Sequence, residues 1–190
     1  LFDLSGRVAL VTGASKGLGE AIALALASAG ADLVIVSRKI EEISTVASNI
    51  SKQTGRRVIG VAGDVTKSTD VERVVQACIE SFGKVDILFN NAGINIRGPI
   101  DELRYDDFKQ VMDVNVNGTW LVSKAVVPHM KSRGQGRIIN LASALGLVGL
   151  SNRTPYASSK GAIVQMTRAL GLELAPHGIT VNALCPGPFL

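Results

Sequence analysis

Short apolar runs alternate with longer amphipathic segments along the whole chain. The runs are rich in β-branched residues and lie at 8–11, 33–36, 58–61, 85–89, 138–141 and 179–184. Segments with helical periodicity begin near Gly17, Ile40, Ser68, Tyr105 and Thr154. This alternation is typical of βαβ units, and continuously apolar strands indicate a parallel sheet covered on both faces. We therefore predict an α/β fold in which residues 1–190 form one domain, a doubly wound parallel sheet with strand order 3-2-1-4-5-6.

Composition excludes several classes of protein. Of 190 residues, 46% are hydrophobic and 19% charged, so the chain can bury a core. The longest run without Asp, Glu, Lys or Arg is 138–152, shorter than the ~20 residues of a membrane helix, so we expect no membrane partner. The net charge of +4 comes from scattered residues, which argues against a nucleic-acid partner. Cys78 and Cys185 lie far apart and indicate neither a disulfide framework nor a metal site, which favours a cytoplasmic location.

Glycine is unusually frequent, and three of the glycines form a pattern typical of phosphate-binding turns. The 20 glycines are about 11% of the chain, against ~7% in an average protein. Gly13, Gly17 and Gly19 are spaced G-x-x-x-G-x-G after the first apolar run, with Ser15, Lys16 and Leu18 between them. Such a turn lets a pyrophosphate approach the backbone and a helix N-terminus, as in Rossmann folds. The alternative is an ordinary strand-to-helix turn.

The end of the second strand bears on the choice of dinucleotide. An NAD site places an acidic residue there for the ribose 2′-hydroxyl, and this chain has Ser37-Arg38-Lys39 instead. Arg38 and Lys16 can bracket a 2′-phosphate, so NADP is favoured over NAD. Solvated surface cations are the other reading.

Polar residues also end the third and fourth strands. Asp64 and Val65 follow one strand, and Asn90-Asn91-Ala92-Gly93 closes the next. Both segments fall on the ligand edge of the predicted sheet, where Asp64 can bind adenine and the Asn/Gly turn can lie along the ribose. Ordinary Asx turns explain each segment equally well when it is taken alone.

One buried amide is expected in the helix after the fourth strand. Asn115 lies on an otherwise apolar stripe with Phe108, Val111, Thr119 and Val122. A buried amide without partners costs ~1 to 3 kcal/mol. Asn115 therefore either locks neighbouring backbone or holds a water near the point where the strand order reverses.

The strongest candidate chemistry lies at the end of the fifth strand and in the helix after it. Ser143 closes that strand, and Thr154 and Pro155 read as the N-cap and first residue of a helix. Tyr156 and Lys160 then share one helix face. An ammonium ~4 Å from a phenol favours the phenolate by roughly 4 kcal/mol at an effective dielectric of ~20, enough to bring the pKa of Tyr156 near neutrality. An aromatic ring stacked on a lysine stem is the ordinary alternative.

Taken together, these motifs resemble the short-chain dehydrogenase/reductase family, and the resemblance covers the whole chain. Within the family, the sequence looks most like gluconate 5-dehydrogenases and 3-oxoacyl-[acyl-carrier-protein] reductases. It does not distinguish between these two groups. The resemblance implies Tyr156 as proton donor, Ser143 as the group that orients the carbonyl, Lys160 on the nicotinamide ribose and Asn115 on a water. It also implies cofactor contacts at Pro186, Gly187 and Phe189, a homodimer or homotetramer, and a seventh strand and substrate loop beyond Leu190.

We therefore expect an NADP-dependent oxidoreductase that interconverts a ketone and a secondary alcohol of a small polar or acyl substrate, with no metal. The alternative is a dinucleotide-binding regulatory or interaction protein without turnover.

Overall fold

Six parallel strands form one sheet in the part of the chain that the structure describes, residues 2–187 of a computed structural model. Their order is β3-β2-β1-β4-β5-β6, which confirms the predicted topology. The strands are β1 (Val8–Thr12), β2 (Asp32–Ser37), β3 (Val58–Ala62), β4 (Ile87–Asn90), β5 (Gly136–Leu141) and β6 (Ile179–Leu184). Since β1 pairs with β2 on one side and β4 on the other, the strand order reverses at β1, and a crevice opens there at the carboxyl ends.

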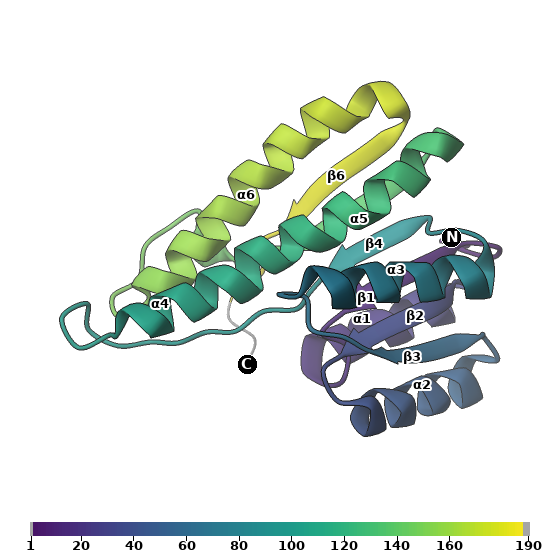
Figure 1. Cartoon of the computed structure of the whole chain (residues 1–190), viewed down its shortest axis with the longest axis horizontal. Helices are drawn as coiled ribbons and strands as arrows, with labels where there is room; N and C mark the ends of the chain where they lie inside the picture. Colours follow the sequence, from purple (N-terminus) through teal and green to yellow (C-terminus); the bar gives the residue numbers. More distant parts are fainter. Residues whose placement is uncertain (1, 188–190) are drawn as a thin grey trace.

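Helices cover both faces of this sheet (Figure 1). They are α1 (Gly17–Ser28), α2 (Ile40–Thr54), α3 (Ser68–Phe82), α4 (Tyr105–Met112), α5 (Gly118–Arg133) and α6 (Thr154–Leu174). Because side chains alternate along a strand, Val8 and Leu10 of β1 join the core under α3 and α5, whereas Ala9 and Val11 join the core under α1 and α2. No helix within residues 2–187 has both the length and the apolar character needed to cross a membrane.

The inner and outer strands differ in burial. All residues of β1 and β4 are buried, as the continuous apolar runs predict. In β6 buried or half-buried residues alternate with exposed ones, because this outer strand is covered on one face.

A π-helical turn interrupts the long helix after β4. Residues Asp113–Asn117 form this turn between α4 and α5, and the Gly118 amide donates to the Asp113 carbonyl, five residues back. The Thr119 hydroxyl donates to the Asn115 carbonyl at 2.7 Å and satisfies that group inside the turn. Such single turns often mark functional sites, and this one carries the buried Asn115.

The start of α6 differs from the prediction by one residue. Arg153 holds the N-cap position and Thr154 is already helical, so the predicted cap by Thr154 is wrong. In the described part of the chain no side chain caps the helix, and the first turn is instead preorganised by Pro155, whose missing N–H needs no partner there.

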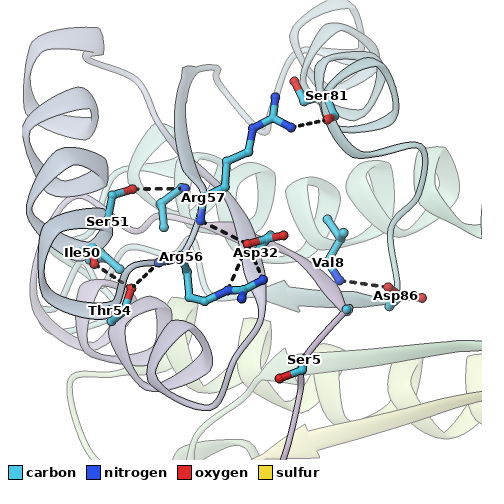
Figure 2. A network of polar contacts seen from close by, with 12 residues as sticks. Ser5, Val8, Asp32, Ile50, Ser51, Thr54, Arg56, Arg57, Ser81 and Asp86 are labelled. Atoms are coloured by element: carbon cyan, nitrogen blue, oxygen red, sulfur yellow. Dashed lines mark hydrogen bonds and ion pairs between the residues drawn. The ribbon is translucent and has the colours of Figure 1, made fainter.

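Charged side chains tie the strands together at the edge opposite the crevice (Figure 2). Asp32 accepts from the Arg56 guanidinium at 2.8 Å and from the Arg57 amide at 3.1 Å, which joins the amino ends of β2 and β3. The Arg57 guanidinium donates to the Ser81 carbonyl at 2.9 Å and lies 4.6 Å above the Phe82 ring, which holds the end of α3. These contacts leave the carboxyl edge free for binding.

Candidate active site

A cleft of about 880 Å³ lies at the carboxyl ends of the strands, within the range of ~300–1,000 Å³ typical of ligand pockets. Most predicted site residues line it: Gly13, Ser15, Lys16, Leu18, Gly19, Arg38, Asp64, Val65, Asn91, Ala92, Gly93, Tyr156 and Lys160. Gly17, Asn115, Ser143, Pro186 and Gly187 lie outside its lining, and Phe189 is outside the described residues. Within residues 2–187, no three His, Cys, Asp or Glu side chains gather as a metal site requires.

The glycine-rich turn packs directly against the turn after β4. Gly13 has φ +66°, and a Cβ there would lie 2.7 Å from the Ala92 Cα. The Asn91 side chain donates to the Thr12 and Gly13 carbonyls at 3.0 and 2.9 Å. In return the Thr12 hydroxyl accepts from the backbone amides of Asn91 and Ala92, both at 3.1 Å. The two turns therefore form one rigid floor, and Thr12 is a structural member of it that the predicted cofactor contacts did not include.

The rim of the cleft near β2 is cationic. Lys16 and Arg38 are exposed there, and neither forms an ion pair within the described part of the chain. The neighbouring Lys39 pairs with Glu42 at 2.8 Å, so its charge is already matched. Lys16 and Arg38 are therefore the two cations of this rim that remain available to an anion.

Asp64 has a structural role in addition to its place in the cleft. One of its carboxylate oxygens accepts from the Thr66 amide at 3.0 Å and from the Thr66 hydroxyl at 2.8 Å. Its own amide donates to the Asp70 carboxylate at 3.0 Å, which holds the start of α3. This is the Asx turn that the sequence left open as an alternative, and the second carboxylate oxygen faces no partner in these contacts.

The Asn115 amide locks two segments around the cleft. Its oxygen accepts from the Ile94 amide at 2.8 Å, and its nitrogen donates to the Ile94 carbonyl at 3.0 Å and to the Ser159 hydroxyl at 2.9 Å. Ser159 in turn donates to the Tyr156 carbonyl at 2.7 Å. Of the two interpretations open from sequence, the structure contains the backbone lock, since both amide protons are used within the protein.

Tyr156 and Lys160 face the cleft from the first turns of α6. The Lys160 ammonium donates to the Leu141 carbonyl at 2.6 Å and lies 5.5 Å from the centre of the Tyr156 ring. Lys160 is 3% exposed, so an ammonium is held in a nearly dry environment with two of its three protons left for other partners. The Ser143 hydroxyl accepts from the Leu145 amide at 3.1 Å, which leaves its own proton for another partner, and it lies close enough to Tyr156 to lower the pKa of that phenol.

Burial dominates the ionisation of both groups. Desolvation lowers the pKa of Lys160 to about 8, which leaves it mainly charged at pH 7. Desolvation raises the pKa of Tyr156, and the hydrogen bond with Ser143 offsets only part of this. The expected lowering of the Tyr156 pKa is therefore wrong, because the phenol is half-buried and the Lys160 ammonium donates to the Leu141 carbonyl.

One wall of the cleft was missed by the sequence prediction. It is formed by the helical face of α4 and the π turn, with Asp106, Lys109, Gln110, Asp113, Val114 and Asn117. Lys109 forms an ion pair with Asp113, and the Asp113 carboxylate also accepts from the side-chain amide of Asn117 at 2.9 Å. The spacing of these residues by three or four positions is the signal that identifies such a face.

Comparisons with known proteins agree with this geometry. A family model described as short chain dehydrogenase matches residues 7–190. A gluconate 5-dehydrogenase of Gluconobacter oxydans is 38% identical over 189 residues, 100% of this chain and 73% of the relative. A solved gluconate 5-dehydrogenase of Burkholderia cenocepacia, in complex with NADP and tartrate, superposes with a TM-score of 0.95 at 38% identity, covering 100% of this chain and 74% of that one. A solved NAD⁺-bound xylitol dehydrogenase superposes with a TM-score of 0.93 at 38% identity, covering 96% and 70%.

Proposed function

The chain belongs to the short-chain dehydrogenase family, and on that premise we propose that it is an NADP(H)-dependent oxidoreductase that interconverts a ketone and a secondary alcohol. The substrate class is a small polar or acyl compound. One observation carries the proposal: Tyr156 and Lys160 line the cleft from a single helix face, with Ser143 close enough to the phenol to affect its pKa.

The floor of the cleft fits a dinucleotide. A Cβ at Gly13 would collide with Ala92, and one at Gly19 would collide with the Gly13 carbonyl and the Asn91 amide. The bare backbone there leaves room for a pyrophosphate beside the N-terminus of α1, whose partial positive charge favours an anion. Lys160, with two free ammonium protons, suits the hydroxyls of a ribose at the other end of the floor.

Three side chains then provide the acid–base chemistry. When bound, the nicotinamide supplies or accepts the hydride. Ser143 and Tyr156 donate hydrogen bonds to the substrate carbonyl oxygen, and Tyr156 gives up its proton as negative charge develops on that oxygen. The raised pKa of Tyr156 keeps the phenol protonated at neutral pH, which suits the donor in the reducing direction. The Lys160 ammonium stabilises the phenolate that remains.

The choice of NADP over NAD follows from charge at the rim. Lys16 and Arg38 form no ion pair within residues 2–187, whereas an acid for a ribose 2′-hydroxyl is absent from the end of β2. A guanidinium binds a phosphate in a bidentate manner, so Arg38 is the residue that we assign to the 2′-phosphate.

The test is Tyr156→Phe assayed with NADPH on a panel of ketones, beside Tyr105→Phe as control. Tyr105 is 76% exposed on α4, so its hydroxyl can be removed without touching the cleft. We expect Tyr156→Phe to lose at least ~10²-fold in kcat, the usual contribution of a general acid, with its affinity for NADPH unchanged. Retention of more than a tenth of the turnover would refute Tyr156 as the acid. NADPH binding without turnover of any ketone by the parent protein would instead favour the non-catalytic alternative.

A further inference from the structure

We propose that Gly146 is a positioning residue of the active site, whose bare backbone contact with Lys160 sets the place of Ser143 relative to Tyr156. This inference rests on the proposed function for its kinetic consequences. The contact itself is independent of any ligand.

Gly146 and Ser143 are the two ends of one hydrogen-bonded turn. Residues Ala144–Gly146 form a short 3₁₀ turn after β5, in which the Gly146 amide donates to the Ser143 carbonyl at 2.9 Å. The Leu145 amide also donates to the Ser143 hydroxyl at 3.1 Å. A displacement of Gly146 therefore moves both the backbone and the hydroxyl of Ser143.

The opposite side of this turn rests on α6 without any intervening side chain. A Cβ on Gly146 would lie 2.7 Å from the Lys160 carbonyl oxygen and 2.8 Å from its carbon, so the obstacle is helix backbone. Gly161 extends the bare surface, since a Cβ there would lie 3.6 Å from the Gly146 oxygen. Gly146 does not have a positive φ, so space rather than backbone conformation requires a glycine at this position.

Two further backbone hydrogen bonds join this segment to the end of β6 and the residues after it. The Ala144 amide donates to the Pro186 carbonyl at 2.9 Å, and the Ala142 amide donates to the Leu184 carbonyl at 2.8 Å. An added methyl group at Gly146 cannot be accommodated by retreat of the turn unless these bonds lengthen. The structure therefore clamps Ser143 between the end of β6 and the residue that carries the site's ammonium.

The first experiment measures Gly146→Ala with NADPH and the best ketone of the panel. We expect kcat to fall about 10- to 100-fold, because a displacement near 1 Å at a catalytic group can cost ~10²-fold, with the Kd for NADPH within about twofold of the parent. Gly149→Ala is the control in the same loop, since no atom of the described residues lies within 4 Å of a Cβ there. Gly60→Ala is the control for the clash, because its Cβ would lie 2.8 Å from the Ile43 carbonyl oxygen, away from the cleft. Both controls should keep their turnover, and a Gly146→Ala variant that behaves like them overturns the proposal.

A second readout does not depend on activity. The chain has two tyrosines, so in a Tyr105→Phe background the ultraviolet titration of the phenol reports Tyr156 alone. The Ser143 hydrogen bond lowers the pKa of Tyr156, so Gly146→Ala should raise the titration midpoint in the same direction as Ser143→Ala. An unchanged midpoint contradicts the inference even if the protein turns over no ketone, whereas absent turnover with a shifted midpoint contradicts only the proposed function. Should Gly146→Ala fail to fold, Gly161→Val presses on the same turn from the helix side and is expected to raise the same midpoint.

Discussion

At the scale of single residues, the state of each charge depends on whether a neighbour already matches it. Lys39 is bound to Glu42, which removes it from competition for an anion, while Arg38 next to it is unmatched. Two adjacent cations of equal formal charge are therefore expected to differ in their effect on the cofactor.

The prediction is that Arg38→Ala weakens binding of NADPH about tenfold and leaves binding of NADH within about twofold, because an exposed charge-assisted hydrogen bond is worth ~1.5 kcal/mol. Fluorescence titration with both dinucleotides measures the ratio. Lys39→Ala is the matched control, and we expect it to change the ratio little. An NADPH preference that survives in Arg38→Ala, or that disappears equally in Lys39→Ala, would remove Arg38 from the 2′-phosphate.

Residue types and their spacing select the candidate acid–base groups, but the ionisation of these groups depends on burial. Charge proximity alone predicted a lowered pKa for Tyr156, since Lys160 lies four positions away on one helix face. The structure places the ammonium on the Leu141 carbonyl and the phenol in a half-buried position, and the pKa of Tyr156 is raised. The Leu141 carbonyl belongs to β5, and its position beside α6 cannot be predicted from the local sequence around Tyr156 and Lys160.

At the scale of elements, the N-terminus of α1 is held against the glycine-rich turn at the floor of the cleft. Gly19 lies in the first turn of α1, where a Cβ would collide with the Gly13 carbonyl and the Asn91 side chain. Both neighbours belong to the rigid floor of the cleft and cannot yield without breaking the Asn91 hydrogen bonds. The helix N-terminus and the floor therefore keep one relative position.

We predict that Gly19→Ala reduces affinity for NADPH at least ~10²-fold, because α1 must move away from the position in which its amides meet the pyrophosphate. Gly171→Ala is the matched control, since Gly171 is also helical but its Cβ would make an ordinary contact of 3.7 Å with the Val181 carbonyl oxygen. Titration with NADPH and circular dichroism together separate lost binding from lost folding. Unimpaired binding by Gly19→Ala would show that the close approach is not needed.

The element pattern predicted the strand order because hydrophobic runs and helical periodicity are local properties. It did not predict the π turn at Asp113–Asn117, since the stripe that contains Asn115 keeps the three- and four-residue spacing of an ordinary helix. The wall formed by α4 was missed because the place of Asp106, Lys109 and Asp113 beside the cleft depends on how the chain folds and not on their spacing in the helix.

At the scale of the whole molecule, the cleft and the buried charged contacts of Asp86 lie at opposite edges of the sheet. The carboxyl edge carries the cleft, whereas the amino edge carries a buried carboxylate, Asp86, that joins the starts of β1 and β4 to the end of α5. Asp86 accepts from the Val8 amide at 2.9 Å (Figure 2) and pairs with Arg133 at 3.0 Å and Lys84 at 3.3 Å. Its side chain is 5% exposed, so this charge is stabilised by the protein rather than by water.

Asp86→Asn should therefore destabilise the whole fold without altering the cleft. We expect a loss of about 2 to 4 kcal/mol in the free energy of unfolding at pH 7, measured by urea denaturation, because the cations lose their buried partner. Glu42→Gln, which removes an exposed carboxylate that pairs with Lys39, should change it by less than ~0.5 kcal/mol. The affinity for NADPH should be the same in Asp86→Asn and the parent protein.

The difference between parent and Asp86→Asn should also depend on pH in one direction. Burial by itself raises the pKa of Asp86, but the Val8 amide, Arg133 and Lys84 outweigh it and hold the pKa below 3.8. A carboxyl whose pKa is lower in the folded state stabilises the protein above its unfolded pKa, and this contribution disappears as the pH falls through the folded value. The stability gap should thus be constant near neutrality and shrink below pH ~4. A gap of full size in strong acid would mean that the carboxylate charge is not what holds the amino edge together.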